Sequence, residues 1–171
     1  MIDPGLALLV SVSLSAALEA AIGEPPGRYH PVAFLGWIIE RLAERPFGRP
    51  RLVGAIYALS VPIASTLVIY GLVGLAGAIH PLVAAALAGV VLWLASSLRL
   101  LLESARRVIE ASEAAPDAAR DALLALVGRE TGGLSPALVR SAAIESLAEN
   151  LSDGLVAPLS AFLALSFVSL P

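Results

Sequence analysis

Three carboxylates spaced four residues apart in the last third of the sequence have the chemistry of a cation site. Glu145, Glu149 and Asp153 would form one row on an α-helix. Ser146 and Asn150 flank this row. Stacked carboxylates repel one another unless a cation neutralises them, and Mg²⁺ accepts one or two carboxylates together with water and phosphate oxygens. The spacing therefore predicts a Mg²⁺ site, and a solvated acidic helix face is the alternative interpretation.

A glycine-rich segment upstream contains groups that could bind a phosphate. It reads Gly128-Arg129-Glu130-Thr131-Gly132-Gly133. Glycine lets the backbone approach a ligand closely, and an arginine can bind phosphate or carboxylate through two parallel hydrogen bonds. Most glycine-rich segments only turn the chain, so this segment alone is a weak indication of a site.

A third group of titratable residues, Glu19, Glu24 and His30, lies in the N-terminal part of the sequence. Glu19 falls within or at the edge of an apolar segment, where an ionisable side chain is costly and indicates function. His30 can act as a general acid or base near neutral pH, or bind an anion when protonated. The alternative interpretations are a hydrogen-bonded loop histidine and, for Glu24, a solvated turn carboxylate.

The composition of the chain indicates a membrane protein and excludes several kinds of site. Of its 171 residues, 58% are hydrophobic, whereas soluble domains are about 45–50% apolar. The sequence has no cysteine, which excludes disulfides, thiolate zinc sites and cysteine nucleophiles. It also has no lysine, which excludes a lysine Schiff base and a P-loop. The net charge of −3 gives no indication of a nucleic-acid partner.

The elements that must position these residues are predicted to be mostly membrane helices. A membrane helix needs about 20 apolar residues, and residues 52–98 contain no Asp, Glu or Arg. This stretch predicts two spans joined by a turn at residues 77–81, rather than a buried helical hairpin of a soluble protein. The first apolar segment lacks preceding positive charge, so we expect a retained helix and not a signal peptide. About four membrane helices are predicted in total, at Gly5–Ile22, Val53–Ala76, Leu82–Leu101 and Gly154–Pro171.

The arginines predict which segments face the cytoplasm. All eleven lie in residues 28–51 and 99–140, and the positive-inside rule places both segments on the cytoplasmic side. The second of these segments predicts short helices. The first is indicated by an apolar stripe over residues 98–111. The second would be opened by Pro116 and capped by Gly128, and the third would be opened by Ser135 and Pro136 and run through Asn150.

We therefore predict an all-α fold with a single membrane domain over residues 1–171. It would be a polytopic bundle of about four membrane helices, with residues 98–153 as a cytoplasmic layer of short amphipathic helices. The protein would be a multi-pass protein of the plasma membrane, with its active face in the cytoplasm.

Residues 140–159 resemble the signature of the CobD/CbiB family, which are membrane enzymes of cobalamin biosynthesis. The similar residues are Glu145-Ser146-Leu147-Ala148-Glu149-Asn150, then Asp153-Gly154 and Val156-Ala157-Pro158. Further similar residues are Gly128-Arg129-Glu130-Thr131, Glu19, Gly23-Glu24-Pro25, His30-Pro31, Gly36 and Glu40. The sequence departs from the family in having Glu where the family has Asp at positions 19, 24 and 130. Family members also continue into a second block of sequence that is not found here.

The resemblance implies an ATP-dependent ligase that forms an amide bond, adenosylcobinamide-phosphate synthase in type. Its corrinoid substrate would be adenosylcobyric acid, whose f propionate is joined to aminopropanol or its phosphate. ATP with Mg²⁺ would activate the carboxylate, as an acyl phosphate or a mixed anhydride. The roles implied for this sequence are Mg²⁺ ligation by Glu145, Glu149 and Asp153, phosphate or substrate binding by Arg129, Thr131, Arg140 and Asn150, and catalysis by Glu19, Glu24, His30, Arg129 and Arg140.

Membrane lipid is an expected partner, and a second-half polypeptide or a homo-oligomer could complete the protein. Two functions of other classes remain open at this point. One is a non-catalytic membrane sensor or subunit related to the family, and the other is a transporter. A transporter would place its polar groups near the middle of the bilayer, whereas most polar groups here lie in the two arginine-bearing segments.

Overall fold

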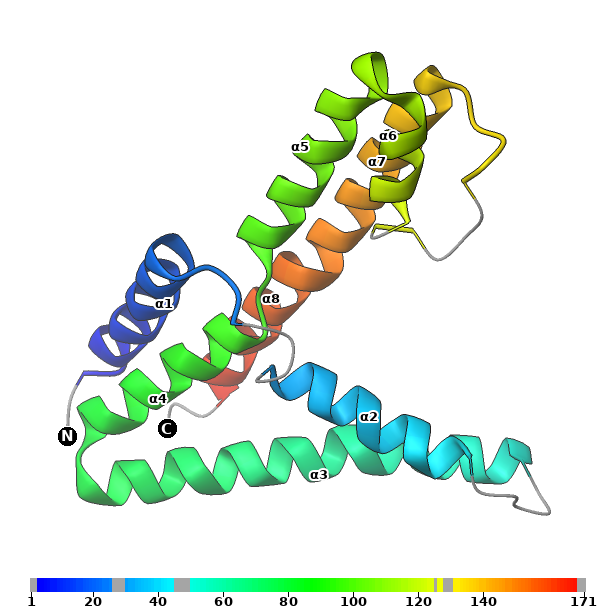
Figure 1. Ribbon diagram of the computed structural model, residues 1–171. Coiled ribbons are helices and arrows are strands. Elements are labelled where there is room, and N and C mark those ends of the chain that lie inside the picture. The colour runs from blue at the N-terminus through cyan, green and yellow to red at the C-terminus, as the bar shows by residue number, and fades with distance from the viewer. Residues whose placement is uncertain (1–2, 26–29, 45–49, 125, 128–130, 169–171) are drawn as a thin grey trace. The chain divides into compact units, whose positions relative to one another are not determined.

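The computed structural model describes residues 3–25, 30–44, 50–124, 126–127 and 131–168, and this part of the chain contains helices and no strand. The helices, shown in Figure 1, are α1 (Pro4–Ala21), α2 (Pro31–Ala43), α3 (Pro50–Ile79), α4 (Pro81–Leu94), α5 (Leu98–Ala114), α6 (Pro116–Leu123), α7 (Pro136–Leu151), a π-helical turn η2 (Ser152–Val156) and α8 (Ala157–Val168). The predicted all-α fold is confirmed.

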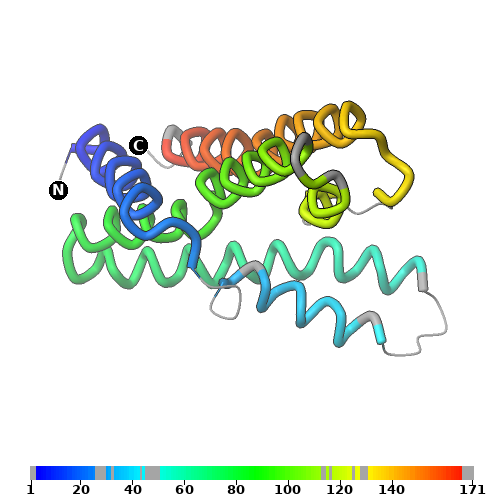
Figure 2. Tube along the Cα trace, turned by 45° about the horizontal axis from the view of Figure 1, so that its top comes forward, coloured from blue at the N-terminus to red at the C-terminus, as the bar shows by residue number. Residues whose placement is uncertain are grey.

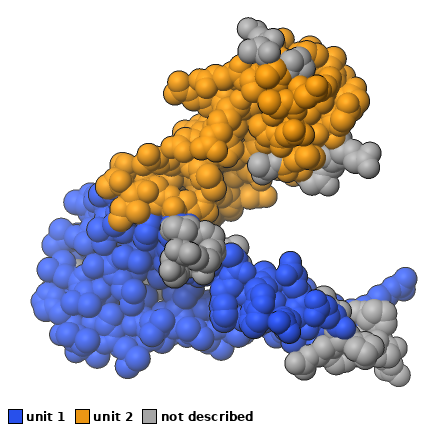
Figure 3. Space-filling view, viewed as in Figure 1, with its two compact units in different colours: residues 1–18, 25–94 blue, residues 19–24, 95–171 orange. Residues whose placement is uncertain are grey.

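The chain divides into two compact units, coloured separately in Figure 3. The first comprises residues 1–18 and 25–94, and the second comprises residues 19–24 and 95–171. The second unit therefore contains the predicted cytoplasmic segment 98–153 together with α8. The single membrane domain predicted over residues 1–171 stays a prediction.

Three helical stretches among the described residues are long and apolar enough to cross a membrane: Pro4–Ala21, Arg51–Ile79 and Pro81–Ser112. They contain most or all of three predicted spans. Large apolar side chains along α3 are exposed, which is expected of residues that face lipid. In lipid these side chains would not contact water, so their exposure would carry no hydrophobic cost. The fourth predicted span, Gly154–Pro171, is not among the three. Its described helix, α8, has 12 residues, fewer than the about 20 that a span needs, and residues 169–171 lie outside the described part.

In the first unit, α3 and α4 form a helical hairpin at the turn predicted from the sequence. His80 separates them, and its Nδ1 accepts a hydrogen bond from the backbone N–H of Leu82 at 3.2 Å. Pro81 is the first residue of α4, where a backbone N–H would have no hydrogen-bond partner within the helix, so the missing N–H of proline costs nothing there. The imidazole thus caps α4, so the sequence of the turn itself ends one helix and starts the next.

Small residues bring α1 and α4 together, as Figures 1 and 2 allow the reader to follow. The hydroxyl of Ser11 donates to the carbonyl of Ala85 at 2.8 Å. A Cβ at Gly89 would lie 2.6 Å from the carbonyl oxygen of Ser11, so no larger residue fits without a shift. Close backbone approach at small residues is typical of packing between membrane helices.

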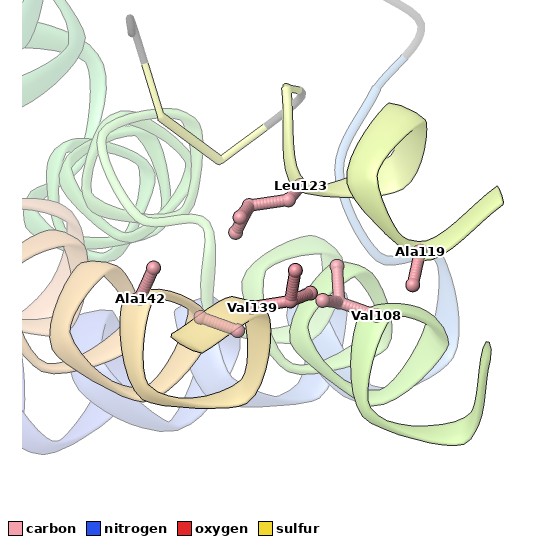
Figure 4. Close-up of a cluster of buried hydrophobic side chains, with 6 residues drawn as sticks. Val108, Ala119, Leu123, Val139 and Ala142 are labelled. Atoms are coloured by element: carbon pink, nitrogen blue, oxygen red, sulfur yellow. The ribbon is translucent and has the colours of Figure 1, made fainter. Parts of the chain in front are cut away.

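In the second unit, α5, α6 and α7 enclose a small apolar core, shown in Figure 4. Val108, Leu123 and Val139 are fully buried and point toward one another. The three helices match those predicted: α5 and α6 begin at the expected residues, and Ser135 caps α7 by accepting a hydrogen bond from the N–H of Leu138 at 3.4 Å. α6 ends at Leu123, and Gly128, its predicted cap, lies outside the described residues.

Candidate functional site

Four polar residues on the C-terminal half of α7 line one pocket of about 340 Å³. They are Glu145, Ser146, Glu149 and Asn150. The rest of the lining comes from Ala142 on the same helix and from Leu126 and Val127, which follow α6. The pocket therefore forms where the chain after α6 crosses α7, and both parts belong to the second unit.

Two hydrogen bonds hold the pocket together. The hydroxyl of Ser146 donates to the carbonyl oxygen of Leu126 at 2.6 Å, which fixes the segment after α6 against α7. Asn150 in turn donates from Nδ2 to the Ser146 hydroxyl at 3.0 Å. Because Nδ2 makes this bond, the amide presents Oδ1 as its acceptor or metal-ligating atom. Ser146 is thus the buried link that orients Asn150.

Two of the three predicted metal ligands line the pocket. Glu145 and Glu149 lie one α-helical turn apart on α7, as the sequence predicted, and both are exposed. Asp153 does not line it. It lies just beyond α7, which ends at Leu151, in the π-helical turn η2.

The donor atoms of the pocket fit Mg²⁺ with two carboxylates. Mg²⁺ accepts one or two carboxylates, and water or phosphate oxygens complete its octahedron. Glu145, Glu149 and the amide oxygen of Asn150 supply such donors. Within the described residues, no three or more His, Asp or Glu side chains gather closely enough to hold an ion. The ligand set of Glu145, Glu149 and Asp153 stays a prediction.

A close backbone contact explains the glycine that follows Asp153. The carbonyl of Gly154 accepts a hydrogen bond from the N–H of Ser97 at 3.2 Å. A Cβ at Gly154 would lie 3.0 Å from the Ser97 hydroxyl, which is tighter than an ordinary contact. Gly154 therefore lets η2 lie against the start of α5, and its role is structural.

Glu19 is placed at the N-terminal end of α5. Its Oε1 accepts a hydrogen bond from the backbone N–H of Arg99 at 2.7 Å, in the first turn of that helix. The guanidinium of Arg99 reaches Glu103 at 2.9 Å and the carbonyl of Ala20 at 3.5 Å. A carboxylate at a helix N-terminus satisfies backbone N–H groups and complements the helix dipole. Glu19 thus stabilises the start of α5, and its predicted catalytic role stays a prediction.

Arg140, a predicted phosphate ligand, does not line the pocket. Its Nη1 donates to the Ser112 hydroxyl on α5 at 3.4 Å. Glu145 and Glu149 lie five and nine residues further along α7, which corresponds to about 140° and 180° around the helix. Arg140 and the acidic pair therefore occupy different sides of α7.

Thr131 and Arg120 fasten the loop that precedes α7. The hydroxyl of Thr131, which is buried, donates to the carbonyl of Arg120 at 3.0 Å. Arg120 donates from Nε to the carbonyl of Leu134 at 2.8 Å. No local pattern in the sequence distinguishes Arg120 from the other arginines. Thr131, predicted to bind substrate or phosphate, has a visible structural contact, and its predicted role is untested.

The remaining predicted residues belong to different units or lie outside the described part of the chain. Arg129 lies outside the described residues. Glu24 belongs to the second unit and is partly buried, whereas His30 belongs to the first. The carbonyl of His30 accepts a hydrogen bond from the N–H of Phe34 at 3.2 Å, so His30 stands at the N-terminal end of α2.

Comparison with known proteins identifies the family. Residues 12–170 match the family described as CobD/Cbib protein. The chain belongs to this family. The signature segment 140–159 of the CobD/CbiB resemblance holds the four polar pocket residues and the close contact at Gly154.

Curated relatives in the CobD/CbiB family are about twice as long as this chain. The probable cobalamin biosynthesis protein CobD of Methanothermobacter thermautotrophicus is 35% identical over 157 residues, which is 91% of this chain and 51% of the relative. The cobalamin biosynthesis protein CobD of Geobacter metallireducens is 32% identical over 168 residues, 95% of this chain and 51% of the relative. The chain thus spans about half the length of these relatives. No solved structure matches it.

Proposed function

We propose that this chain acts in cobalamin biosynthesis, in the ATP-dependent step that joins the f propionate of adenosylcobyric acid to aminopropanol or its phosphate. The family match supports the pathway. The observation that carries the proposal of catalysis is the pocket on α7, where two carboxylates and an oriented amide converge within the family signature. A scaffold protein would have no need of such a polar pocket.

The proposed chemistry requires an activated acid. A carboxylate oxygen of the corrinoid attacks a phosphorus of ATP, and the P–O bond to the leaving part of the nucleotide breaks. ADP leaves if an acyl phosphate forms, and pyrophosphate leaves if the anhydride forms with AMP. The activated acyl group keeps the attacking oxygen as part of its leaving group. The amine nitrogen then attacks the acyl carbon, the C–O bond to the phosphorus-bearing group breaks, and the nitrogen loses a proton. Formation of the amide therefore needs neutralised phosphate charge, a proton acceptor and exclusion of water from the activated acid.

We assign the residues of this chain to those needs as follows. Glu145, Glu149 and Asp153 would hold Mg²⁺ with help from the amide oxygen of Asn150, and of these residues Glu145, Glu149 and Asn150 line the pocket. When bound, Mg²⁺ supplies positive charge for the phosphate oxygens of ATP. The groups proposed to bind phosphate or substrate are Arg129, Thr131 and Arg140, of which Arg140 would act away from the Mg²⁺ ligands because it lies on another side of α7. The proton acceptor is His30 or Glu24, and Glu19 supports the site by stabilising the start of α5.

Exposed apolar side chains on α7 support the proposal that a partner covers this helix and completes the site. Leu138 and Ile144 are 55% and 58% exposed, next to the pocket carboxylates on the same helix. Lipid does not readily explain this exposure, because α7 carries Arg140, Glu145 and Glu149 and is not among the candidate membrane spans. We propose that a polypeptide corresponding to the rest of the family's length covers this face, and a second copy of the chain is the alternative. The site would then face the cytoplasm at the plasma membrane.

Complementation tests the proposed activity. The chain is expressed in cells that lack the amide-forming step, alone and together with the other half of a relative, and conversion of adenosylcobyric acid is measured. We expect conversion in at least the second case and its loss in Glu149→Gln. The matched control is Glu110→Gln, which alters an exposed carboxylate on α5 that pairs with Arg106. If membrane-inserted chain gives no conversion in either case, a sensor or subunit role replaces the proposed enzyme.

A further inference from the structure

Helix α2 is too short to cross a membrane, yet it lies between two helices that can. It has 13 residues, about 20 Å at 1.5 Å per residue. Candidate spans precede it in α1 and follow it in α3. Within the first unit, α2 packs against α3, as Figure 1 shows. The membrane spans therefore hold α2 near the bilayer.

One exposed side of α2 carries two aromatic rings and a cation. Phe34 and Trp37 are 61% and 52% exposed, and Arg41 is exposed as well. The three residues are spaced three and four positions apart, so they share one side of the helix. The rings of Phe34 and Trp37 stack with centroids 5.9 Å apart, and the Arg41 guanidinium lies 5.4 Å from the Trp37 ring centroid.

Neither water nor the bilayer core suits this face. In water, two large stacked rings would remain half exposed, which the hydrophobic effect opposes. In the hydrocarbon core, the charges of Arg41 and its exposed neighbour Glu40 would be desolvated. The headgroup region accommodates both, because tryptophan is enriched there and an arginine can keep its aliphatic part in apolar surroundings while its cation reaches phosphate.

The charge of the surrounding segment matches an anionic surface. Residues 28–51 contain five Arg against two Glu. Arginine clusters beside membrane helices are attracted to anionic lipid headgroups. Along the exposed face, polarity also increases from Phe34 through Trp37 to Arg41, as it does across the outer part of a bilayer leaflet.

We propose that the face formed by Phe34, Trp37 and Arg41 anchors α2 in the membrane interface and binds the phosphates of anionic phospholipids. The rings lie among the upper parts of the acyl chains, and the Arg41 guanidinium contacts the headgroups. This anchor holds the start of α3 at a fixed depth. It does not depend on the proposed enzymatic activity.

Depth-dependent fluorescence quenching tests the position of the face. The sequence has two tryptophans, so Trp93→Phe leaves Trp37 as the only one. The full chain is reconstituted in vesicles whose lipids carry bromine either near the headgroup or near the chain end. We expect severalfold stronger quenching by the shallow bromines and an emission maximum shifted to the blue of an aqueous tryptophan. If Trp93→Phe fails to fold, the difference between the unaltered chain and Trp37→Phe gives the same quantity.

Three results would overturn this position. Quenching by aqueous iodide without quenching by lipid places Trp37 in water. Stronger quenching by the deep bromines places it in the hydrocarbon core. Quenching by neither indicates that a second copy or another polypeptide covers the face.

A second measurement tests recognition of anionic lipid. The Trp37 emission is followed as phosphatidylglycerol replaces phosphatidylcholine in the vesicles. We expect a progressive blue shift that Arg41→Gln abolishes and that Arg106→Gln, an exposed control on α5, leaves intact. If Arg41→Gln and the unaltered chain respond alike, binding of headgroup phosphate by Arg41 is excluded.

Discussion

At the scale of single residues, the pocket depends on one buried hydroxyl. Ser146 connects the carbonyl of Leu126 to the amide of Asn150, so a side chain that carries no charge sets the geometry around the acidic pair. The partners in the first of these bonds are 20 residues apart in the sequence. A catalytic interpretation that considers only Glu145 and Glu149 would overlook the residue that positions their neighbour.

Replacing Ser146 with alanine should destabilise the second unit. Ser146→Ala removes the partner of the Leu126 carbonyl and of Asn150 Nδ2, and an unsatisfied group of this kind costs about 1–3 kcal/mol. Ser141→Ala, an exposed change on the same helix, should alter stability by less than about 0.5 kcal/mol. Thermal unfolding in detergent, followed by circular dichroism, compares the two variants. Equal midpoints would show that the hydrogen bonds through Ser146 contribute nothing to stability.

Removing a pocket carboxylate should weaken Mg²⁺ binding. We expect Glu149→Gln to raise the dissociation constant for Mg²⁺ by about tenfold or more, which is about 1.4 kcal/mol, because a charged ligand is lost. Asp153→Asn should have a smaller effect if the pocket geometry is retained, since Asp153 does not line it. Isothermal calorimetry on the purified chain measures both, with Glu110→Gln as control. An unchanged affinity in Glu149→Gln would remove this residue from the ligand set.

At the scale of elements, contacts at the start of α5 join three separate parts of the second unit. Glu19 accepts a hydrogen bond from the first turn of the helix, and Gly154 accepts one from Ser97 just before it. The end of α1, the start of α5 and the turn η2 after α7 are thereby held together. Two residues of the family resemblance, Glu19 and Gly154, thus have structural roles at one helix end.

Variants of Glu19 can separate a capping role from a catalytic one. Glu19→Gln keeps an oxygen that accepts the Arg99 N–H and loses only the charge, which is worth about 0.3–1 kcal/mol at a helix N-terminus. Glu19→Ala also removes the hydrogen bond and should cost about 1 kcal/mol more. Unfolding midpoints should therefore fall in the order unaltered chain, Gln, Ala. Loss of activity in Glu19→Gln with an unchanged midpoint would instead indicate direct participation in the reaction.

Glycine at position 154 should be required for the contact of η2 with α5. Gly154→Ala brings a Cβ to 3.0 Å from the Ser97 hydroxyl, which must then shift by a few tenths of an ångström. We expect a cost at the low end of the about 1–3 kcal/mol typical of overpacking. Gly132→Ala, where no atom lies within 4 Å of the added Cβ, is the matched control. The double variant Ser97→Ala, Gly154→Ala should recover part of the loss in unfolding midpoint. If the double variant recovers none of the midpoint, the destabilisation by Gly154→Ala arises from the backbone of the π-helical turn and not from the contact with Ser97.

At the scale of the whole molecule, two of the three candidate spans among the described residues, α1 and α3, lie mainly in the first unit, and the pocket lies in the second. The third candidate span, Pro81–Ser112, begins in the first unit and continues through most of α5 in the second. The pocket residues on α7 lie outside these three candidate spans, whereas the polar site of a transporter would lie among the spans.

Cysteine labelling should establish which side of the membrane each part faces. The chain has no cysteine, so single substitutions report one position each. We expect Ala78→Cys, beside the turn between α3 and α4, to react with a membrane-impermeant maleimide in intact cells. Ser141→Cys on α7 should react only after the membrane is made permeable, because the arginine-bearing segments are retained in the cytoplasm. Reaction of both in intact cells would contradict the predicted orientation.

The sequence by itself determined most of the helices and several of their ends, but not α2 or the break between α4 and α5. The tertiary structure decided which polar residues share a site. The signals for α3, α4, the start of α6 and α7 are local in the sequence. They are a long stretch without charged residues, Pro81, Pro116 and the Ser135 cap, and each acts on its own neighbours in the chain, so these elements could be predicted. The pocket depends on contacts between distant segments, and local patterns contain no information about those contacts. Only the fold could show that Arg140 turns toward α5, that Ser146 holds Leu126, and that Asp153 does not line the pocket.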